Sequence, residues 1–410
     1  MGLLRRQLVI GALVGNAIRP LPGARAGMAV FGAGWLTGEL APHLLAFTAL
    51  DTATQVARRK ATGPGLAAAA VTAGGLAWLI KDAYGAGRVV ESSLSEGLGA
   101  DYRDRLATPP TARDLAMPWG EVARPFRMRR REVQRIHDVN YTTGGRRARL
   151  DVYLPRPVAG EPPLTGAPVL VQVHGGAWMT GKKEDQGQLL MGRMASRGWV
   201  CVALNYRLAP KHRWPAQIVD TKKAVAWVKD NIEQYGGDPS YVVITGGSAG
   251  GHLAALTALT PGDPAFQPGF EDADTSVAAC VPFYGVYDLA ALTGTRASQG
   301  LRRFLARWIF PSPPDAEHLV DYEQASPLAR ITPEAPDFYV IHGSNDTVVP
   351  IAQARAFVAR LRETSKQTVT YSEVHGAQHA FEVFSSIRSQ HVVKAVERWL
   401  EWHRATRIES

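Results

Sequence analysis

The chain has 410 residues, of which 46% are hydrophobic, and a formal net charge of +9. Its two cysteines exclude a disulfide scaffold, and its His, Cys, Asp and Glu residues show no metal-ligand spacing. It contains no P-loop and no dinucleotide fingerprint, and its basic residues are not interleaved with aromatic ones as nucleic-acid binding would require. We therefore expect no cofactor, no metal and no nucleic-acid partner.

Two stretches near the N-terminus, residues 27–50 and 63–80, are apolar and rich in Gly and Ala. The second contains no charged residue and approaches the length that spans a bilayer. Two membrane helices, one spanning helix and helices lying on a bilayer all fit this pattern, as does a pair of soluble helices docked on the rest of the chain. Basic residues flank both ends of the first stretch, which favours a single span at residues 63–80.

A cleaved export signal is a further interpretation of the N-terminus. Arg5-Arg6 resembles a twin-arginine start, residues 8–15 form a short apolar core, and Ala24-Arg25-Ala26 has the shape of a cleavage site. Asn16 and Arg19 count against it. The N-terminus thus indicates a membrane or cell-envelope location, with an exported or a cytoplasmic protein as alternatives.

Arginines crowd the segment that follows the apolar stretches. Nine of them lie close together: Arg124, Arg127, Arg129, Arg130, Arg131, Arg135, Arg146, Arg147 and Arg149. A solvated surface that faces lipid headgroups is the simplest account of this concentration of charge.

From Val133 onward, short apolar runs alternate with helical patterns. We expect strands at residues 133–142, 148–154, 168–174, 200–206, 241–246, 277–284, 338–342 and 368–374. Helices are expected between them at 182–197, 216–235, 249–259, 350–364 and 385–405. This alternation predicts an α/β fold with a mostly parallel, eight-stranded sheet covered by helices on both faces. Such sheets carry their sites at the carboxyl ends of the strands.

The strand at residues 167–173 runs into His174-Gly175-Gly176-Ala177-Trp178. Consecutive glycines after a strand let main-chain N–H groups approach a substrate oxygen without hindrance from Cβ atoms. We expect His174 to hold this loop through hydrogen bonds and Trp178 to act as a packing or wall residue.

Residues 241–251 read Tyr-Val-Val-Ile-Thr-Gly-Gly-Ser-Ala-Gly-Gly and are the most informative part of the chain. A strand, a G-x-S-x-G turn and a helix form a nucleophile elbow, with Ser248 on the turn. Gly246 and Gly250 are required because strand and helix approach each other closely there. The dipole of the following helix favours negative charge that develops beside Ser248.

Residues 290–328 interrupt the alternation and are expected to form a cap insertion. Their segment Leu301–Phe310 is amphipathic and is followed by prolines. Together with part of residues 85–130, the insertion is expected to roof an acyl pocket. A surface helix without substrate contact is the alternative.

An acid and a base follow Ser248 in the order expected for this architecture. Asp346 lies just past the strand at 338–341, whereas Asp337 precedes that strand and falls at the wrong end of the sheet. His379 follows the last strand and is the expected general base. His375 is the competing histidine, four residues earlier at the end of that strand.

These motifs together resemble the α/β-hydrolase carboxylesterases of the hormone-sensitive-lipase-like group, from about Val133 to the C-terminus. Three further segments carry the resemblance: Asn205–Pro210, Trp214–Asp220 and Gly236–Pro239. It implies an α/β-hydrolase fold, the triad Ser248, Asp346 and His379, and oxyanion donors in the amides of Gly175, Gly176 and Ala249. No cofactor is implied.

The chain departs from that group at three places. Ala177 replaces the third glycine of the oxyanion loop, Gly247 replaces an Asp before the nucleophile, and the acid loop reads His-Gly-Ser-Asn-Asp. These variants are similar to a branch of formamidase-like and feruloyl-esterase-like hydrolases. With its N-terminal segment included, the chain resembles the membrane-associated Lip-type esterases of actinobacteria.

The sequence therefore predicts a serine carboxylesterase or lipase acting on small acyl esters or lipids of short to medium chain length. An amide hydrolase of the arylformamidase type with the same triad is the alternative, and an inactive interaction protein with this fold is a third class. We expect residues 1–90 to form an apolar helical region that associates with a membrane surface. Residues 91–130 are expected to form a linker that contributes to the cap, and residues 131–410 the catalytic domain. The oligomeric state is left open.

Overall fold

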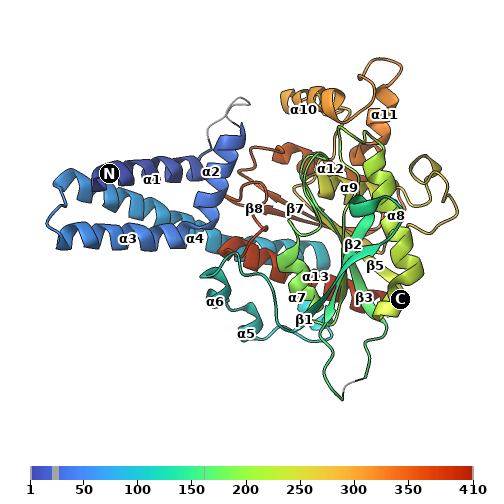
Figure 1. Cartoon of the computed structure of the whole chain (residues 1–410), viewed down its shortest axis with the longest axis horizontal. Coiled ribbons are helices and arrows are strands. Elements are labelled where there is room, and N and C mark those ends of the chain that lie inside the picture. Colours follow the sequence, from blue (N-terminus) through green and yellow to red (C-terminus); the bar gives the residue numbers. More distant parts are fainter. Residues whose placement is uncertain (1, 21–26, 161, 409–410) are drawn as a thin grey trace.

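The computed structural model describes residues 2–20, 27–160 and 162–408. It has a body built around one sheet and a helical arm that projects from the body (Figure 1). The arm is formed by the N-terminal helices, and the body contains all the catalytic motifs.

The sheet of the body has eight strands in the order β1-β2-β4-β3-β5-β6-β7-β8. The strands from β4 to β8 in this order pair in parallel, whereas β1 and β2 are antiparallel to their neighbours. All eight predicted strands are present: β1 (Val133–Asn140), β2 (Arg149–Pro155), β3 (Ala167–Val173), β4 (Val200–Leu204), β5 (Gly237–Gly247), β6 (Ala279–Phe283), β7 (Asp337–Gly343) and β8 (Val369–Val374). The prediction of a mostly parallel α/β sheet is confirmed.

Strand β3 lies at the centre of the sheet and is buried along its whole length. Its Val171 pairs with Val202 of β4 on one side and with Ile244 of β5 on the other. Branched apolar residues on both faces of the central strands require a covering layer on each side.

Helices supply both covering layers and enclose two apolar cores. The long helices of the body are α7 (Gln188–Ala195), α8 (Ala216–Asn231), α9 (Ala249–Leu259), α12 (Ile351–Thr364) and α13 (Ile387–Ile408). One core joins α8, α9 and α12 to the sheet through residues such as Ile218, Leu253 and Phe357. The other joins α7 and α13 to the opposite face through Met191 and Trp399.

Helix α7 begins six residues later than the sequence pattern indicated. Residues 182–187 form a loop in which the Lys183 amide donates to the Asn205 side chain at 2.8 Å. Gly187 precedes the helix with a φ of 74°, a left-handed conformation that ends the loop.

Shorter elements connect these layers. Between β6 and β7, the predicted insertion contains α10 (Arg296–Trp308), α11 (Leu319–Gln324) and the 3-10 turn η5 (Pro327–Ala329). The other short helices are η1 (Tyr102–Arg105), α5 (Ala112–Leu115), α6 (Trp119–Val122), η2 (Gly145–Ala148), η3 (Ile232–Tyr235) and η4 (Pro264–Phe266).

The arm is formed by α1 (Leu3–Ile18), α2 (Gly27–Glu39), α3 (Ala41–Ala57) and the first half of α4 (Gly63–Leu98). The apolar stretch at 27–50 is not one helix, because the chain turns at Leu40 between α2 and α3. The stretch at 63–80 opens a helix of 36 residues, long and apolar enough to cross a membrane. The Ala24-Arg25-Ala26 motif lies outside the described residues.

The second half of α4 belongs to the body rather than to the arm. Its buried residues Ala86, Val90 and Leu94 join the core that contains α13. The predicted boundary at residue 90 therefore falls inside a continuous helix, which ties arm and body together.

A first prediction concerns the close contact of α9 with β3. A Cβ atom at Gly250 would lie 2.1 Å from the carbonyl oxygen of Val173. We expect Gly250→Ala to destabilise the protein by about 1–3 kcal/mol, because backbone on both sides must move. Gly85→Ala is the matched control, since a Cβ at Gly85 meets nothing within 4 Å. Thermal unfolding midpoints measure the difference, and equal midpoints for the two variants would contradict the prediction.

Candidate active site

Ser248 occupies a strained turn between β5 and α9. Its φ and ψ of 58° and −120° lie in a region that side chains rarely adopt. The Ser248 amide donates to the Phe283 carbonyl at 3.0 Å and so ties the turn to β6. A Cβ atom at Gly246 would lie 2.5 Å from the Gly250 carbonyl oxygen, and one at Gly250 would lie 2.1 Å from the Val173 carbonyl oxygen, which explains the glycine at each end of the motif.

Asp346 and His379 meet at the carboxyl ends of β7 and β8. Nδ1 of His379 lies 2.7 Å from Oδ2 of Asp346, and both side chains are buried. The other oxygen of Asp346 accepts from the amides of Val348 and Val349, each at 2.8 Å. With Nδ1 donating to the carboxylate, a neutral His379 carries its lone pair on Nε2, which is the state that a general base needs.

The environment of Asp346 favours its ionised form. Burial by itself would raise the pKa of Asp346, but the charge of His379 and hydrogen bonds from His342 and His379 outweigh it and lower the pKa below its ordinary value. Asp346 is therefore a carboxylate at neutral pH and stabilises an imidazolium on His379.

The competing candidates lie elsewhere. His375 is largely exposed, and its Nδ1 pairs with Asp82 of α4 at 2.6 Å. Asp337 opens β7 at the opposite end from Asp346 and pairs with His403 at 3.2 Å. The structure thus brings together Asp346 and His379 and separates them from both alternatives.

Tyr284 connects the base to the nucleophile elbow. Its ring centroid lies 4.5 Å from that of His379, and a Cβ atom at Gly247 would lie 2.6 Å from the Tyr284 hydroxyl. One ring therefore touches both the residue before Ser248 and the base. The hydrogen bonds of the described residues do not include one between Ser248 and His379; such bonds often tighten only with substrate bound.

The same tyrosine accounts for Gly247, where the resembled group has an Asp. The Tyr284 hydroxyl fills the space of a side chain at 247 and donates to the Glu382 carboxyl. Glu382 is buried, and burial raises its pKa to about 7 despite that hydrogen bond. Sequence reasoning missed both residues, because neither lies in a recognisable motif.

The oxyanion loop places the three predicted donor amides in different surroundings. The amide of Gly175 donates to Oε1 of Gln186 at 2.6 Å and is therefore not available to an oxyanion in this arrangement. Gln186 reaches it because residues 182–187 form a loop rather than the predicted helix. Within the described residues, the amides of Gly176 and Ala177 have no acceptor, and Ala249 opens α9, where first-turn amides lack intrahelical partners.

His174 and Trp178 have structural roles, as the sequence predicted. The His174 ring stacks on Tyr206 with centroids 4.3 Å apart, and its Nδ1 lies 2.7 Å from the Gly175 carbonyl oxygen. Burial lowers the pKa of His174 to about 4, so it is neutral and donates to that oxygen. Nε1 of Trp178 donates to His252 at 3.1 Å, which fixes the indole as part of the wall.

A second prediction follows from Glu382. Since its folded-state pKa is about 7 and its ordinary value is 4.5, the folded protein keeps a proton that the unfolded chain loses between these pH values. The contribution of this proton to the free energy of unfolding is fully present below about pH 4.5 and is lost as the pH rises through about 7. We expect Glu382→Gln to flatten the decline of the unfolding midpoint between pH 5 and pH 8. The exposed Glu334→Gln is the control; parallel pH profiles for both variants would refute the assignment.

Comparison with known proteins identifies the family to which the chain is similar. The BD-FAE family model matches residues 150–361, which include the elbow and the acid loop. The chain is 46% identical over 338 residues to the probable carboxylic ester hydrolase LipM of Mycobacterium tuberculosis, covering 81% of this chain and 76% of that protein. It is 43% identical over 323 residues to the esterase LipQ of the same organism, covering 77% and 74%.

Solved structures show the shared fold. The butyrate-bound esterase Est2 of the Planctomycetes species Thermogutta terrifontis superposes with a TM-score of 0.54 and 24% identity. The match covers 67% of this chain and 94% of that one. From its family match, its fold and these relatives, the chain belongs to the BD-FAE family of α/β-hydrolases, among proteins named as carboxylic ester hydrolases and esterases.

Proposed function

We propose that this protein is a serine carboxylesterase that hydrolyses acyl esters of short to medium chain length through Ser248, His379 and Asp346. The observation that carries the proposal is the 2.7 Å contact between His379 and a buried Asp346 at the sheet edge where β5 ends in the Ser248 elbow. A strained serine, a histidine of fixed tautomer and a carboxylate are the parts that acyl transfer needs.

In the proposed reaction, His379 takes the Ser248 proton on Nε2 while Oγ attacks the ester carbonyl carbon. The tetrahedral oxyanion accepts hydrogen bonds from the amides of Gly176 and Ala249, with the Ala177 amide in place of that of Gly175. The C–O bond to the alcohol breaks, and His379 returns the proton to the leaving oxygen. Water, deprotonated by His379, then attacks the acyl carbon; the bond from that carbon to Ser248 Oγ breaks, His379 returns the proton to Oγ, and the acid is released.

A third prediction tests the triad. We expect Ser248→Ala and His379→Ala each to lower kcat/KM for p-nitrophenyl butyrate by at least about 10³-fold, because each removes a step that the others cannot replace. His375→Ala is the matched control and keeps the parent rate, since His375 pairs with Asp82 away from the elbow. A fluorophosphonate probe should label the parent protein and His375→Ala fully. It should label His379→Ala weakly and Ser248→Ala not at all.

Each alternative class has its own outcome in these assays. Faster turnover of N-formylkynurenine than of p-nitrophenyl butyrate would favour the amide hydrolase. Absence of both turnover and labelling in the parent protein would favour the inactive interaction protein.

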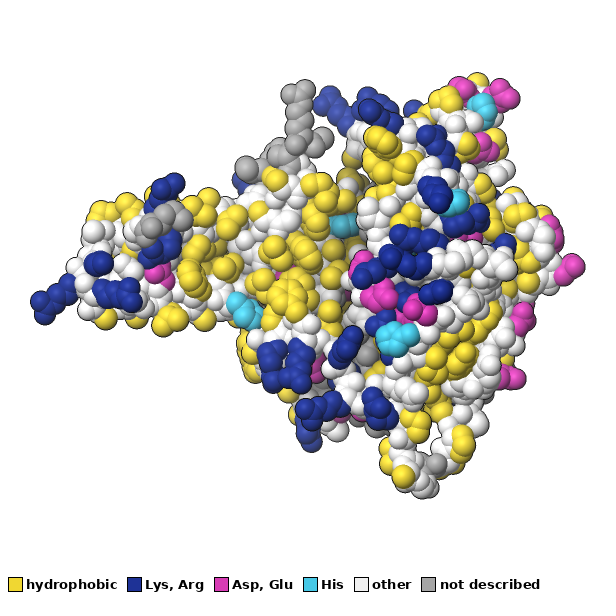
Figure 2. Space-filling model, viewed as in Figure 1, with side chains coloured by type: hydrophobic (Ala, Val, Ile, Leu, Met, Phe, Trp, Pro, Cys, Tyr) yellow, Lys and Arg dark blue, Asp and Glu magenta, His cyan; other side chains and the backbone are white. Residues whose placement is uncertain are grey.

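We also propose that the arm is inserted in a membrane. Apolar side chains lie on both the inner and the outer faces of its helices, beside a few polar residues and the Arg6–Asp51 ion pair, and this pattern fits lipid surroundings better than water. Ile10, Val14, Leu76 and Leu79 pack inside the arm. Figure 1 shows these helices projecting from the body, and Figure 2 shows apolar side chains over the surface of the arm. Large apolar residues of the arm are exposed: Leu8, Val9, Phe47, Leu50, Leu66 and Val71.

The interior of the arm has close helix contacts of the kind found in bilayers. Oγ1 of Thr72 donates to the Gln7 carbonyl at 3.1 Å, and a Cβ atom at Gly75 would lie 2.6 Å from the Val14 side chain. The uncharged part of α4, Gly63 to Ile80, is about 27 Å long, close to the hydrocarbon thickness of a bilayer. Basic residues lie at its outer end in Arg58, Arg59 and Lys60.

A fourth prediction tests this insertion. Val71 is 77% exposed, so Val71→Glu has little effect on a soluble arm but costs about 2.5–3.5 kcal/mol in lipid. We expect the parent protein to stay with membranes after a carbonate wash and Val71→Glu to be released in a larger fraction. Val320→Glu, an exposed site on α11, is the control. Full release of the parent protein by carbonate would overturn the insertion.

A further inference from the structure

Helix α2 lies against the loop that carries the catalytic base. The Phe31 ring contacts the His379 ring edge-on, with centroids 5.9 Å apart. Gly34, one turn further along, approaches the side chain of Gln378, next to the base. A segment that begins more than 300 residues before His379 thus forms part of its surroundings.

Four aromatic rings continue from His379 to the protein surface. Phe31 stacks on Trp35 at 5.7 Å, Trp35 contacts Phe384 at 5.3 Å, and Phe384 contacts Phe126 at 5.1 Å. The Phe126 side chain at the outer end is 67% exposed. We call these four rings, Phe31, Trp35, Phe384 and Phe126, the aromatic row.

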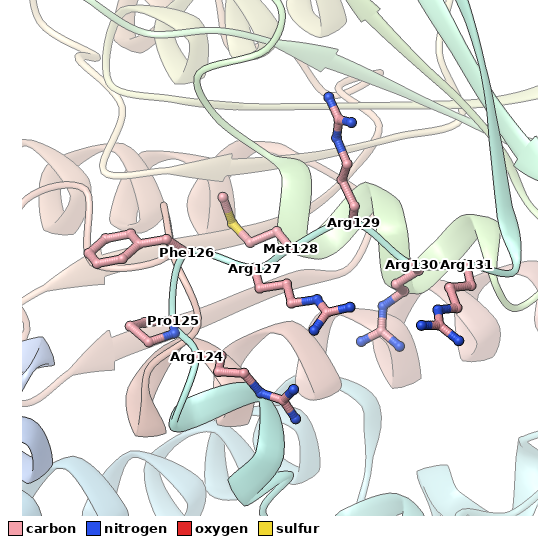
Figure 3. A pocket seen from close by; sticks show the side chains of 8 residues that line it. All are labelled: Arg124, Pro125, Phe126, Arg127, Met128, Arg129, Arg130 and Arg131. Carbon is pink, nitrogen blue, oxygen red and sulfur yellow. The ribbon is translucent and has the colours of Figure 1, made fainter.

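The outer end of the aromatic row meets the basic loop, residues 124–131. Figure 3 shows the Phe126 ring on one side of this loop and the guanidinium groups of Arg127 and Arg130 on the other. The loop lines a depression of about 740 Å³. Arg124, Arg127, Arg129 and Arg131 are exposed, and Figure 2 shows basic groups beside the apolar surface at the base of the arm. Cationic groups beside exposed apolar rings match the headgroup and acyl layers of an anionic bilayer.

Polar contacts hold α2 and the arm at the site. Glu39, the last residue of α2, accepts hydrogen bonds from Ser386 at 2.5 Å and from the buried Arg388 at 2.9 Å. Arg388 also pairs with Asp82 of α4 at 2.6 Å. At the acid loop, the Asn345 side chain donates to the Ala17 carbonyl at the end of α1 at 3.2 Å. The arm is therefore fixed to both the acid loop and the base loop.

We propose that α2 is a wall of the acyl-binding site and that the ester reaches His379 along the aromatic row from a lipid bilayer. The substrate class is then an acyl ester that resides in a membrane, with its polar part near the basic loop and its acyl chain against Phe31. This inference rests on the proposed esterase function and adds that the substrate enters the active site from the bilayer, past α2.

The test of the wall uses the full chain in detergent micelles with p-nitrophenyl acetate and p-nitrophenyl octanoate. Phe31→Ala removes the ring beside His379 and should lower kcat/KM for octanoate about 10-fold, with a several-fold smaller loss for acetate, because only the longer chain extends along α2. Phe47→Ala, an exposed ring on α3 of the arm, is the matched control. Stoichiometric labelling by a fluorophosphonate shows that the site of Phe31→Ala is folded.

An unchanged ratio of octanoate to acetate kcat/KM in Phe31→Ala would overturn the proposal that α2 lines the acyl-binding site. If both values fell equally, the result would assign Phe31 to the support of His379 instead. Undiminished hydrolysis by Ser248→Ala would instead overturn the esterase proposal itself, so the two failures are distinguishable.

The side of approach is tested with vesicles. Vesicles of phosphatidylcholine and phosphatidylglycerol should raise octanoate turnover by the parent protein several-fold over vesicles of phosphatidylcholine alone. The double variant Arg127→Gln, Arg129→Gln should lose that difference, while Lys211→Gln, on the body surface, retains it. No response of the parent to anionic lipid, or a response that the double variant keeps, would overturn the bilayer as the source of substrate.

Discussion

The contact of α9 with β3 is the constraint on which the arrangement of the site depends. Ser248 can project from the sheet only because its backbone adopts a disfavoured conformation, and that conformation is held by neighbours on every side. Val173 and His174 approach Gly250 from β3, and Phe283 binds the Ser248 amide from β6. Because β3 also leads into the oxyanion loop, the packing that strains the serine places the oxyanion loop beside it.

The acid and base loops depend on a second set of contacts, which reaches beyond the catalytic body. Arg388 is buried between Glu39 of α2 and Asp82 of α4, while Asn345 binds the end of α1. Removal of one partner from a buried ion pair usually costs several kcal/mol, since it leaves an uncompensated charge. The N-terminal helices are therefore part of the structure around the site, and a bilayer that holds the arm would also hold the aromatic row at a fixed depth.

Gly247 stands before the nucleophile where the resembled group has an acidic residue, and a tyrosine–glutamate pair lies beside it. Tyr284 fills the space beside Gly247 and binds Glu382, so a carboxyl group stays near the catalytic histidine but comes from a different loop. The motif around Ser248 alone therefore does not reveal which side chains surround position 247. In this chain the space beside position 247 is filled by the Tyr284 hydroxyl instead of a side chain at that position.

The sequence by itself determined the elements and their order. Apolar strands alternating with helices specify a parallel sheet, and glycines around Ser248 specify the turn, because both are local consequences of side-chain periodicity and backbone sterics. It also indicated Asp346 and His379 through their positions after strands. Only the tertiary structure decided that Gln186 occupies the Gly175 amide, that Tyr284 and Glu382 flank the base, and that Phe31 lies against His379. These contacts join residues far apart in the chain, and no local pattern encodes which side chain fills a space formed by distant segments.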